Sequence, residues 1–215
     1  MTNEFSDFGT TVISDALDSL GIYGGCRDLR AITPGGRCAG PAYTLQFVPV
    51  EPGERAPSAD YIDDVPGNAV IVIDNGGRTH CTVWGDILTA CAMARGIAGT
   101  VIDGCCRDSA GIRAQGYPMF ARAAFMKSGK NRVRMAARQV PVSIGGTEVH
   151  PGDVIVCDDD GVLAVPAGRA AEVAAVAREV AAMEARVLAA IGAGATLREA
   201  RRANDYDRFA WKGTR

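Results

Sequence analysis

Histidine is scarce in this sequence, which contains only His80 and His150. A metal site made of several imidazoles, or a Ser-His-Asp triad, is therefore hard to build from this chain. The seven cysteines are odd in number and include no C-x-x-C pair, which indicates reduced thiols rather than a disulfide framework or a zinc site. Reduced thiols are typical of the cytoplasm, where we expect the protein to be located.

Long apolar runs and a strong net charge are also lacking. No segment approaches the roughly 20 apolar residues that a membrane span needs, and the opening MTNEFSDFG has neither the basic nor the apolar region of a secretory signal. The formal net charge of -2 argues against binding to nucleic acid. A local basic stretch is interpreted as a solvated loop and strand edge, with anion binding or a subunit contact as alternatives: Lys127, Lys130, Arg132, Arg134 and Arg138.

The composition that is present suits a folded domain. Of the 215 residues, 47% are hydrophobic and 22% are charged, which permits a large core without covalent cross-links. We expect a single domain over residues 1–215. It comprises an α/β core at 10–166, followed by C-terminal helices and a tail at 167–215.

The centre of the sequence alternates between predicted strands and helices. A buried strand is expected at 69–74, ended by Asn-Gly-Gly, and another at 99–103. Between them, 86–95 is predicted to be a helix that is apolar nearly all round and therefore buried. A further helix at 109–117 and a strand at 118–124 follow. This order predicts a parallel sheet with right-handed crossovers.

The flanking segments have different patterns. Apolar residues at helical spacing predict an amphipathic helix at 10–20, and partial alternation predicts a strand at 42–50. Short alternating runs separated by Gly-Gly, Pro-Gly-Asp and Asp-Asp-Gly predict antiparallel hairpins at 140–166. An Ala-rich helix is expected at 167–191, and a short helix with a polar tail at 196–215.

Polar residues stand at both ends of the central helix-strand segment. Because parallel strands bring their carboxyl ends to one sheet edge, we expect Asp86 at the helix start to lie near Arg107 and Asp108 after the second strand. Free N–H groups at the helix start favour an anion, and Gly85 permits close approach to the backbone. The two carboxylates are suited to bind Mg²⁺ or Mn²⁺, and Arg107 to stabilise an oxygen on which negative charge develops.

Each of these residues also has a simpler interpretation. Asp86 can be an ordinary first-turn residue of a helix, and Arg107 with Asp108 can form a surface ion pair or cap the next helix. Cys105 and Cys106 are most simply small buried hydrophobic residues.

Other polar residues near this edge have structural or functional interpretations of the same kind. His80 lies in the loop that faces the edge and is a candidate for substrate contact or proton transfer. Asp74 and Asp103 are interpreted as turn caps. The Asp-Asp-Asp-Gly stretch at 158–161 lacks the ligand pattern of a calcium loop and is interpreted as a hairpin turn.

Asp86, twenty intervening residues and Arg107-Asp108 form the pattern D-x20-R-D. This pattern resembles that of the class II pyruvate aldolases that cleave 4-hydroxy-4-methyl-2-oxoglutarate and 4-carboxy-4-hydroxy-2-oxoadipate. The same fold family contains the regulators of ribonuclease E activity. The resemblance covers residues 10–200 and includes SDALDSLG (14–21), GPAYTL (40–45), GIAGTVIDGCCRD (96–108), GYPMFAR (116–122) and VPVSIGGTEVHPGDVIVCDDDGVLAVP (140–166).

The resemblance implies a fold, an assembly and an activity. The fold would be an αββαβ swivelling-type domain in a homotrimer, or in a hexamer of two trimers, with active sites at subunit interfaces. The activity would be retro-aldol cleavage of a 4-hydroxy-2-oxo acid to pyruvate and a second oxo acid, with oxaloacetate decarboxylation by the same enolate chemistry. The alternatives are a non-catalytic protein that binds a ribonuclease or other partner, and a sibling lyase or decarboxylase acting on another 2-oxo acid.

The resemblance also implies residue roles. Asp108 would bind Mg²⁺ or Mn²⁺, Asp86 would hold metal-bound water, and Arg107 would support the enolate oxygen. The backbone amides of Gly85, Asp86, Ile87 and Leu88 would hold the pyruvyl carboxylate.

A glutamate on the long C-terminal helix of a neighbouring subunit would complete the implied site. Glu184 is the preferred match and Glu179 the alternative. His80 and the two adjacent cysteines are not part of the family pattern.

Overall fold

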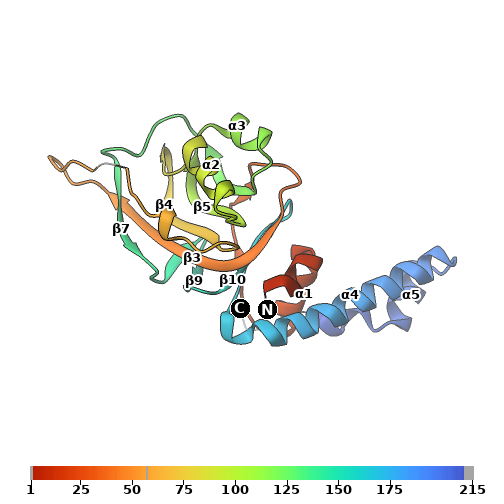
Figure 1. Ribbon diagram of the computed structural model, residues 1–215. Helices are drawn as coiled ribbons and strands as arrows, with labels where there is room; N and C mark the ends of the chain where they lie inside the picture. The colour runs from red at the N-terminus through yellow and green to blue at the C-terminus, as the bar shows by residue number, and fades with distance from the viewer. Residues whose placement is uncertain (1, 57, 211–215) are drawn as a thin grey trace.

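Four parallel strands form the centre of the protein in a computed structural model that describes residues 2–56 and 58–210 (Figure 1). In spatial order they are β3 (Cys38–Pro49), β4 (Val70–Thr82), β5 (Gly99–Cys106) and β6 (Met119–Ala124). All three neighbouring pairs are parallel. The parallel sheet expected from the strand-helix alternation is therefore confirmed.

Antiparallel strands extend this sheet on both sides. They are β1 (Gly25–Cys26), β2 (Arg30–Ala31), β7 (Val133–Arg138), β10 (Val154–Asp158) and β11 (Gly161–Val165). A separate hairpin consists of β8 (Val142–Ile144) and β9 (Thr147–Val149). Both β8–β9 and β10–β11 are antiparallel hairpins, as the turn residues in this part of the sequence predict.

Short helices connect the parallel strands. The crossover helix α2 (Asp86–Ala94) joins β4 to β5, and α3 (Ser109–Ala114) joins β5 to β6. Side chains of β4 alternate between two hydrophobic clusters, with Ile71 and Ile73 in one and Val70 and Val72 in the other. A strand covered on both faces needs apolar residues at every position, which explains the continuous apolar run in the sequence.

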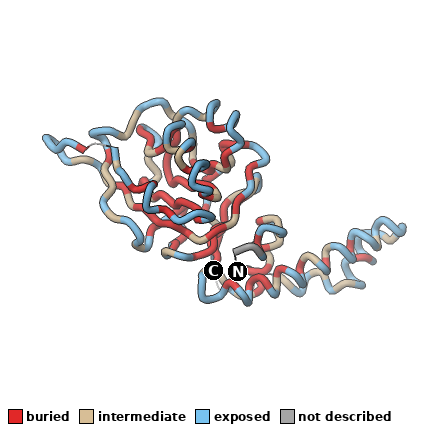
Figure 2. The backbone as a smooth tube through the Cα atoms, in the orientation of Figure 1, coloured by how far each residue is buried: buried red, intermediate tan, exposed pale blue. Residues whose placement is uncertain are grey.

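The remaining helices form an arm that extends away from the sheet (Figure 1). It contains α1 (Thr10–Ser19), α4 (Ala170–Gly192) and α5 (Leu197–Ala203), and α1 packs on α4 through a cluster that includes Ile13 and Val180. Figure 2 shows buried residues throughout the sheet but only along parts of the arm. Short 3₁₀ helices lie at Thr2–Asp7, Ile62–Asp64, Ala167–Arg169 and Tyr206–Phe209. The last part of the predicted tail, 211–215, lies outside the described residues.

The expected end of the first central strand was wrong. β4 continues past Asp74, with register shifts before Arg78 and again before Thr82. Gly76 and Gly77 have φ angles of 58° and 68°, which glycine adopts readily, so the chain bulges outward and then resumes pairing. β5 is correspondingly longer and ends at Cys106. The carboxyl edge of the sheet therefore lies beyond the positions predicted for it.

The prediction that the crossover helix is buried all round was also wrong. Only Thr89 and Ala92 of α2 are buried. Ile87 is 77% exposed and Met93 is 45% exposed. The helix covers the sheet with one side only, so apolar composition did not reveal which side meets solvent in the single chain.

No helix within 2–56 and 58–210 combines the length and the apolar character that crossing a membrane requires. All seven cysteines are free thiols and six of them are buried, in agreement with the expectation of reduced cysteines.

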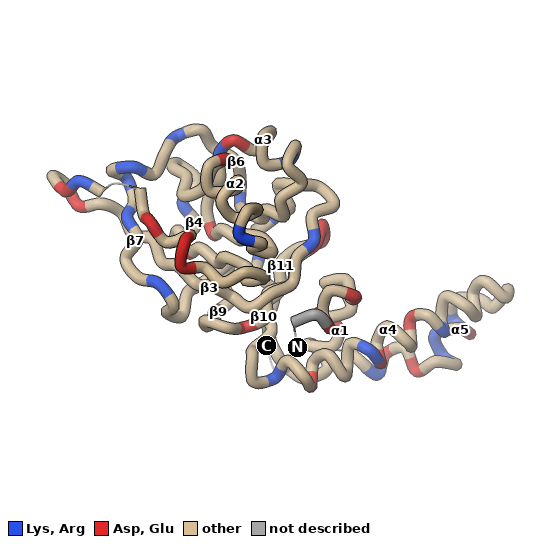
Figure 3. Tube along the Cα trace, in the orientation of Figure 1, with Lys and Arg blue, Asp and Glu red and all other residues tan. Residues whose placement is uncertain are grey.

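Two arginines of the basic stretch, both on β7, pair with acidic residues. Arg134 lies 3.2 Å from a carboxylate oxygen of Glu54, and Arg138 pairs with Asp64. Figure 3 shows basic segments along β7 with acidic segments nearby. Lys127 and Lys130 form no ion pair with the described residues. The interpretation of a solvated strand edge is thus the simplest one for the arginines of β7.

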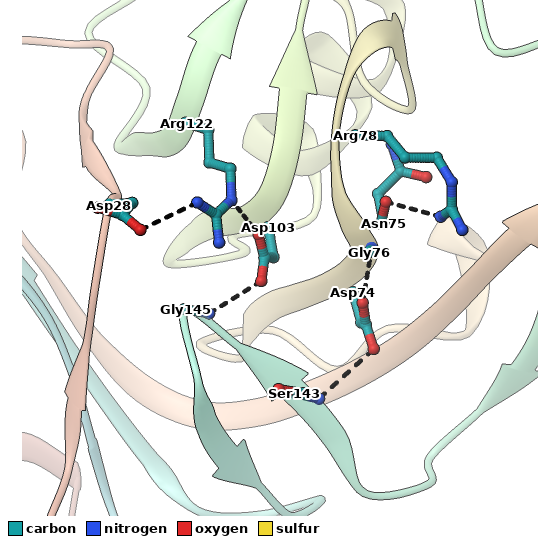
Figure 4. A network of polar contacts seen from close by, with 9 residues as sticks. All are labelled: Asp28, Asp74, Asn75, Gly76, Arg78, Asp103, Arg122, Ser143 and Gly145. Carbon is teal, nitrogen blue, oxygen red and sulfur yellow. Dashed lines mark hydrogen bonds and ion pairs between the residues drawn. The ribbon is translucent and has the colours of Figure 1, made fainter.

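Asp74 and Asp103 connect the sheet to the β8–β9 hairpin (Figure 4). Asp103 is 5% exposed, forms an ion pair with Arg122 and accepts a hydrogen bond of 2.9 Å from the backbone of Gly145. Asp74 accepts hydrogen bonds from the N–H groups of Gly76 (2.7 Å) and Ser143 (3.4 Å). Both carboxylates are therefore engaged in turns, as the sequence indicated.

The acidic stretch at 158–161 is the turn of the β10–β11 hairpin, in which Asp158 is paired with Gly161. Asp158 accepts hydrogen bonds from the backbone N–H of Thr10 (2.8 Å) and from its hydroxyl (2.6 Å). The interpretation of this stretch as a hairpin turn is confirmed.

Loss of the Arg122 guanidinium is expected to destabilise the fold. In Arg122→Met, the buried Asp103 carboxylate would lose its cationic partner, which costs about 3 kcal/mol of unfolding free energy in comparable cases. The control is Arg138→Met, because Arg138 and Asp64 have side chains that are 50% and 61% exposed. Such an exposed pair contributes little to stability, because water screens the two charges. Urea unfolding measures both variants, and equal losses would contradict the assigned role of Asp103.

Candidate active site

The two ends of the D-x20-R-D segment meet at the carboxyl edge of the sheet. The backbone N–H of Arg107 donates a hydrogen bond of 3.0 Å to the carbonyl oxygen of Trp84. The backbone N–H of Asp86 donates to Oδ2 of Asp108, at 3.2 Å, across 22 positions of sequence. The expected proximity of Asp86 to Arg107 and Asp108 is confirmed.

The Asp108 carboxylate faces α2 rather than its own helix. Asp108 has φ 56° and ψ 31°, a left-handed conformation that aspartate tolerates better than most residues, and its side chain makes no capping hydrogen bond to α3. Its Oδ2 lies 3.2 Å from Nε of Arg107, and both side chains are more than a third exposed. The ion-pair interpretation holds, while the side-chain cap of the next helix is not formed.

The first backbone N–H groups of α2 donate hydrogen bonds to carboxylates of the protein itself. Asp108 accepts from Asp86, and Oδ1 of Asp86 accepts a hydrogen bond of 2.8 Å from the backbone of Ile87. These N–H groups have no acceptor within the helix, and the helix dipole favours negative charge there. The start of α2 therefore binds carboxylate groups in the chain itself.

Gly85 allows this close approach. A Cβ atom at this position would stand 2.6 Å from Oδ2 of Asp108 and 3.1 Å from Nε of Arg107. The backbone of Gly85 is extended and available to any residue. Glycine is therefore needed at this position because a side chain would collide with Asp108 and Arg107, and not because of its backbone conformation.

A cavity of about 270 Å³ opens beside these residues and combines apolar and polar walls. Its lining includes the predicted residues Gly85, Asp86, Ile87, Leu88 and Arg107. Asp108 contacts Asp86 and Arg107 and is not itself among the lining residues.

Most of the other residues that line the cavity were not predicted as site residues. They include Phe47, Ser58, Ala59, Asp60, Tyr61, Ser128, Gly129, Lys130 and Val133. Pairing of β3 with β7 and a bridge between Thr82 and Ser128 bring these distant segments together. No local motif in the sequence marks such positions, although Lys130 belongs to the basic stretch for which anion binding is one interpretation.

The other candidates do not line the cavity. His80 is exposed on the irregular part of β4 and does not line it. Cys105 and Cys106 are fully buried. Burial raises the pKa of Cys106 to about 11, and burial also raises that of Cys105. Both remain thiols near neutral pH, so they are poor nucleophiles and act as small apolar residues.

Neither C-terminal glutamate reaches the cavity within one chain. Glu184 lies on α4, in the arm, where burial raises its pKa and the nearby Asp15 of α1 raises it further. Glu179 pairs with Arg208 at 2.9 Å. Contribution of Glu184 by a neighbouring subunit stays a prediction.

The donor set at the edge fits a hard divalent cation. Within the described residues, no group of three or more His, Cys, Asp or Glu side chains is arranged to hold a metal ion. Asp86 and Asp108 together offer two carboxylates at the helix start. Mg²⁺ is commonly bound by one or two carboxylates and retains several waters, whereas structural zinc requires four protein ligands.

The chain is similar in sequence to known proteins. A family model described as RraA-like, Aldolase/RraA, matches residues 10–164. Protein DlpA of Legionella pneumophila is 45% identical over 203 residues, which are 94% of this chain but 33% of that protein. The chain thus spans a third of that relative. A Halalkalibacterium halodurans protein named "Putative 4-hydroxy-4-methyl-2-oxoglutarate aldolase" is 34% identical over 77% of this chain and 76% of its own length.

Solved structures share the fold. An uncharacterized protein from Pseudomonas syringae superposes with a TM-score of 0.87 and 48% identity, covering 93% of this chain and 96% of that one. RraAS2 of Streptomyces coelicolor, described as an unusual member of the RNase ES inhibitor RraA protein family, superposes with a TM-score of 0.74 and 31% identity. That match covers 83% of this chain and 91% of RraAS2. The mixed α/β fold expected from the resemblance is confirmed.

Gly85→Ala should disrupt the site while sparing the fold. The new methyl group would displace the Asp108 carboxylate and the Arg107 side chain, both of which can move into solvent. We expect a loss of about 1 kcal/mol or less in unfolding free energy, together with at least tenfold weaker binding of Mn²⁺ by electron paramagnetic resonance.

Gly111→Ala is the matched control, because a Cβ at Gly111 of α3 meets nothing within 4 Å. It should leave Mn²⁺ binding unchanged. Unaltered Mn²⁺ affinity in Gly85→Ala would show that the cation does not depend on this arrangement.

Glu184→Gln should stabilise the protein slightly at neutral pH. Because the pKa of Glu184 in the folded protein is raised above its usual 4.5, this group disfavours the folded state once it ionises. Stability is therefore greatest at pH values below 4.5 and falls as the pH rises. The gain at pH 7.5 should be small, because the group is partly exposed and screened by solvent, and it should vanish near pH 4. Glu179→Gln, which breaks an ion pair, should show no such gain. Urea unfolding at both pH values measures the difference, and a loss of stability in Glu184→Gln at pH 7.5 would contradict it.

Proposed function

Because this chain belongs to the RraA-like family of aldolases and RraA proteins, we propose that it is a lyase that cleaves a 4-hydroxy-2-oxo acid to pyruvate and a second oxo acid. The observation that carries the proposal is the hydrogen bond from the backbone N–H of Asp86 to the Asp108 carboxylate, which brings both aspartates and Arg107 together beside a cavity. The name of the Halalkalibacterium halodurans relative supports the aldolase assignment.

The start of α2 would bind the carboxylate of the pyruvyl group. The substrate carboxylate would take the place of Oδ1 of Asp86 at the Ile87 N–H and extend to the N–H of Leu88. Asp86 would then be free to turn toward the cavity. The dipole of α2 favours this anion, and the remainder of the substrate would extend into the cavity.

Asp108 and Asp86 would hold a Mg²⁺ or Mn²⁺ ion, directly and through water respectively. When bound, such an ion supplies Lewis-acid polarisation of the 2-oxo group. Arg107 would donate from its guanidinium to the same keto oxygen as negative charge develops during cleavage of the C3–C4 bond.

Protons would be handled by water and carboxylates. A water oriented by Asp86, or by Glu184 of a neighbouring subunit, would accept the proton of the C4 hydroxyl as the bond breaks. A second water would deliver a proton to C3 of the pyruvyl fragment. Oxaloacetate should lose CO₂ at the same site, because its decarboxylation passes through the same enolate.

We propose further that the site is completed in a homotrimer or hexamer. Ile87 and Met93 are exposed on α2 beside the cavity, and α4 carries Glu184 on an arm away from its own cavity. Both features suit contacts between copies of the chain. The free thiols support a location in a reducing compartment such as the cytoplasm.

A non-catalytic role in binding a ribonuclease or another protein is the alternative. It draws on the description of RraAS2 as a member of an RNase inhibitor family. The cavity and the polar residues around it favour catalysis. Activity on a different 2-oxo acid would use the same residues, so a panel of oxo acids distinguishes the substrates.

Arg107→Ala and Asp108→Asn should each lower pyruvate release from a 4-hydroxy-2-oxo acid by about 100-fold or more, since single groups that stabilise developing charge have effects of this size. Lactate dehydrogenase and NADH measure the pyruvate, with Mg²⁺ or Mn²⁺ present. EDTA should abolish release by the unmodified protein. Arg113→Ala, an exposed arginine of the neighbouring α3, is the control and should retain full activity.

Turnover by Asp108→Asn at the rate of the unmodified protein would contradict the proposed site. Borohydride trapping of pyruvate on Lys130, which lines the same cavity, would indicate Schiff-base chemistry instead. Absence of turnover with every oxo acid in the panel would favour the binding role.

A further inference from the structure

A buried hydrogen-bond chain lies directly behind the start of α2. The indole Nε1–H of Trp84 donates to the hydroxyl oxygen of Thr89 at 2.8 Å. That hydroxyl in turn donates to the carbonyl oxygen of Gly85 at 3.0 Å. Trp84 is 2% exposed and Thr89 is completely buried. The chain therefore satisfies an indole donor and a hydroxyl where water has no access.

This chain controls the peptide unit that faces the candidate site. The Gly85 carbonyl also accepts the backbone N–H of Thr89, at 3.1 Å. The N–H on the other side of the same planar peptide, that of Asp86, donates to Asp108 at 3.2 Å. Because the peptide is rigid, fixing its carbonyl from behind also fixes the direction of its N–H in front.

Trp84 is itself held in place by β5 and its neighbours. Its ring stacks on Tyr117 with centroids 6.1 Å apart and planes 6° apart. The Tyr117 hydroxyl lies 2.9 Å from the hydroxyl of Thr100 on β5. The Trp84 carbonyl accepts the N–H of Arg107. Trp84 thus contacts both the Thr89 hydroxyl, on the buried side of α2, and the backbone N–H of Arg107 at the candidate site.

A threonine hydroxyl that bonds to the carbonyl four residues earlier is common in helices and has no function of its own. Here the hydroxyl has a second, buried partner in Trp84, a residue that also lines the cavity. The contact therefore extends from the cavity wall to the first peptide of α2, which an isolated helical threonine would not do.

We propose that Thr89 is a positioning residue for the carboxylate of the 2-oxo acid. Its hydroxyl, oriented by Trp84, holds the Gly85–Asp86 peptide so that the first N–H groups of α2 and the Asp108 carboxylate keep their relative positions. Thr89 touches no substrate and acts only through this peptide. The inference rests on the proposed function for its effect on catalysis, whereas its effect on α2 is independent of it.

The test compares Thr89→Val with Thr89→Ser. Valine keeps the shape of threonine but removes the hydroxyl, and serine keeps the hydroxyl. The matched control is Thr44→Val, because Thr44 is also fully buried and its hydroxyl donates to a backbone carbonyl, that of Val140, at 2.6 Å away from the cavity. Both valine variants should lose similar stability in urea, so unfolding alone does not separate them.

Enzyme kinetics and amide hydrogen exchange distinguish Thr89→Val from Thr44→Val. Thr89→Val should raise KM for the oxo acid about tenfold, as expected for loss of one well-formed hydrogen bond at the binding groups, with a smaller effect on kcat. Thr89→Ser and Thr44→Val should stay within about twofold of the unmodified protein in KM. Amide hydrogen exchange, followed by mass spectrometry on a peptide that spans the start of α2, should accelerate in Thr89→Val alone.

The outcomes distinguish this inference from the proposed function. Faster exchange in Thr89→Val with an unchanged KM would overturn the positioning role, and unchanged exchange would overturn it whatever the kinetics. If the unmodified protein shows no turnover, the proposed lyase activity fails. In that case, faster exchange at α2 in Thr89→Val alone still supports Thr89 as the residue that holds this peptide.

Discussion

The parallel pairing of β4 with β5 through the crossover helix α2 is the constraint on which the candidate site depends. A parallel pair requires the chain to return to the same end of the sheet before the second strand can begin. One helix and one strand therefore separate Asp86 from Asp108, and the same geometry brings them to a hydrogen bond of 3.2 Å. The absence of a side chain at Gly85 lets the carboxylate and the guanidinium approach the helix.

The aspartates near the carboxyl ends of β4 and β5 form two separate groups. Asp74 and Asp103 lie opposite each other where the register first breaks, and the β8–β9 hairpin and Arg122 engage them. Pairing of β4 and β5 then resumes and extends the edge to Thr82 and Cys105. The carboxylates beyond that point, Asp86 and Asp108, remain accessible to a ligand. The bulge thus separates the structural carboxylates from those of the candidate site.

The predictable part of this molecule is the part that follows from local patterns. Continuous apolar runs identified β4 and β5, and the D-x20-R-D spacing identified the residues that meet. The extension of β4 was not predictable, because the sequence Asn75-Gly76-Gly77 is compatible both with the end of a strand and with a bulge inside a longer strand. The cavity wall was not predictable either. Phe47, Tyr61 and Val133 come together only through tertiary pairing, and no spacing in the sequence records it.

In the proposed function, this edge of the sheet forms and stabilises the enolate of a 2-oxo acid. Pyruvate itself tests it, without knowledge of the full substrate. The intact protein is incubated with pyruvate and Mn²⁺ in D₂O, the Mn²⁺ is removed by chelation, and the methyl protons are then followed by NMR. We expect deuterium to replace them in the presence of the protein, and EDTA added at the start to stop the exchange. Exchange no faster than with Mn²⁺ alone, or exchange insensitive to EDTA, would contradict the claim.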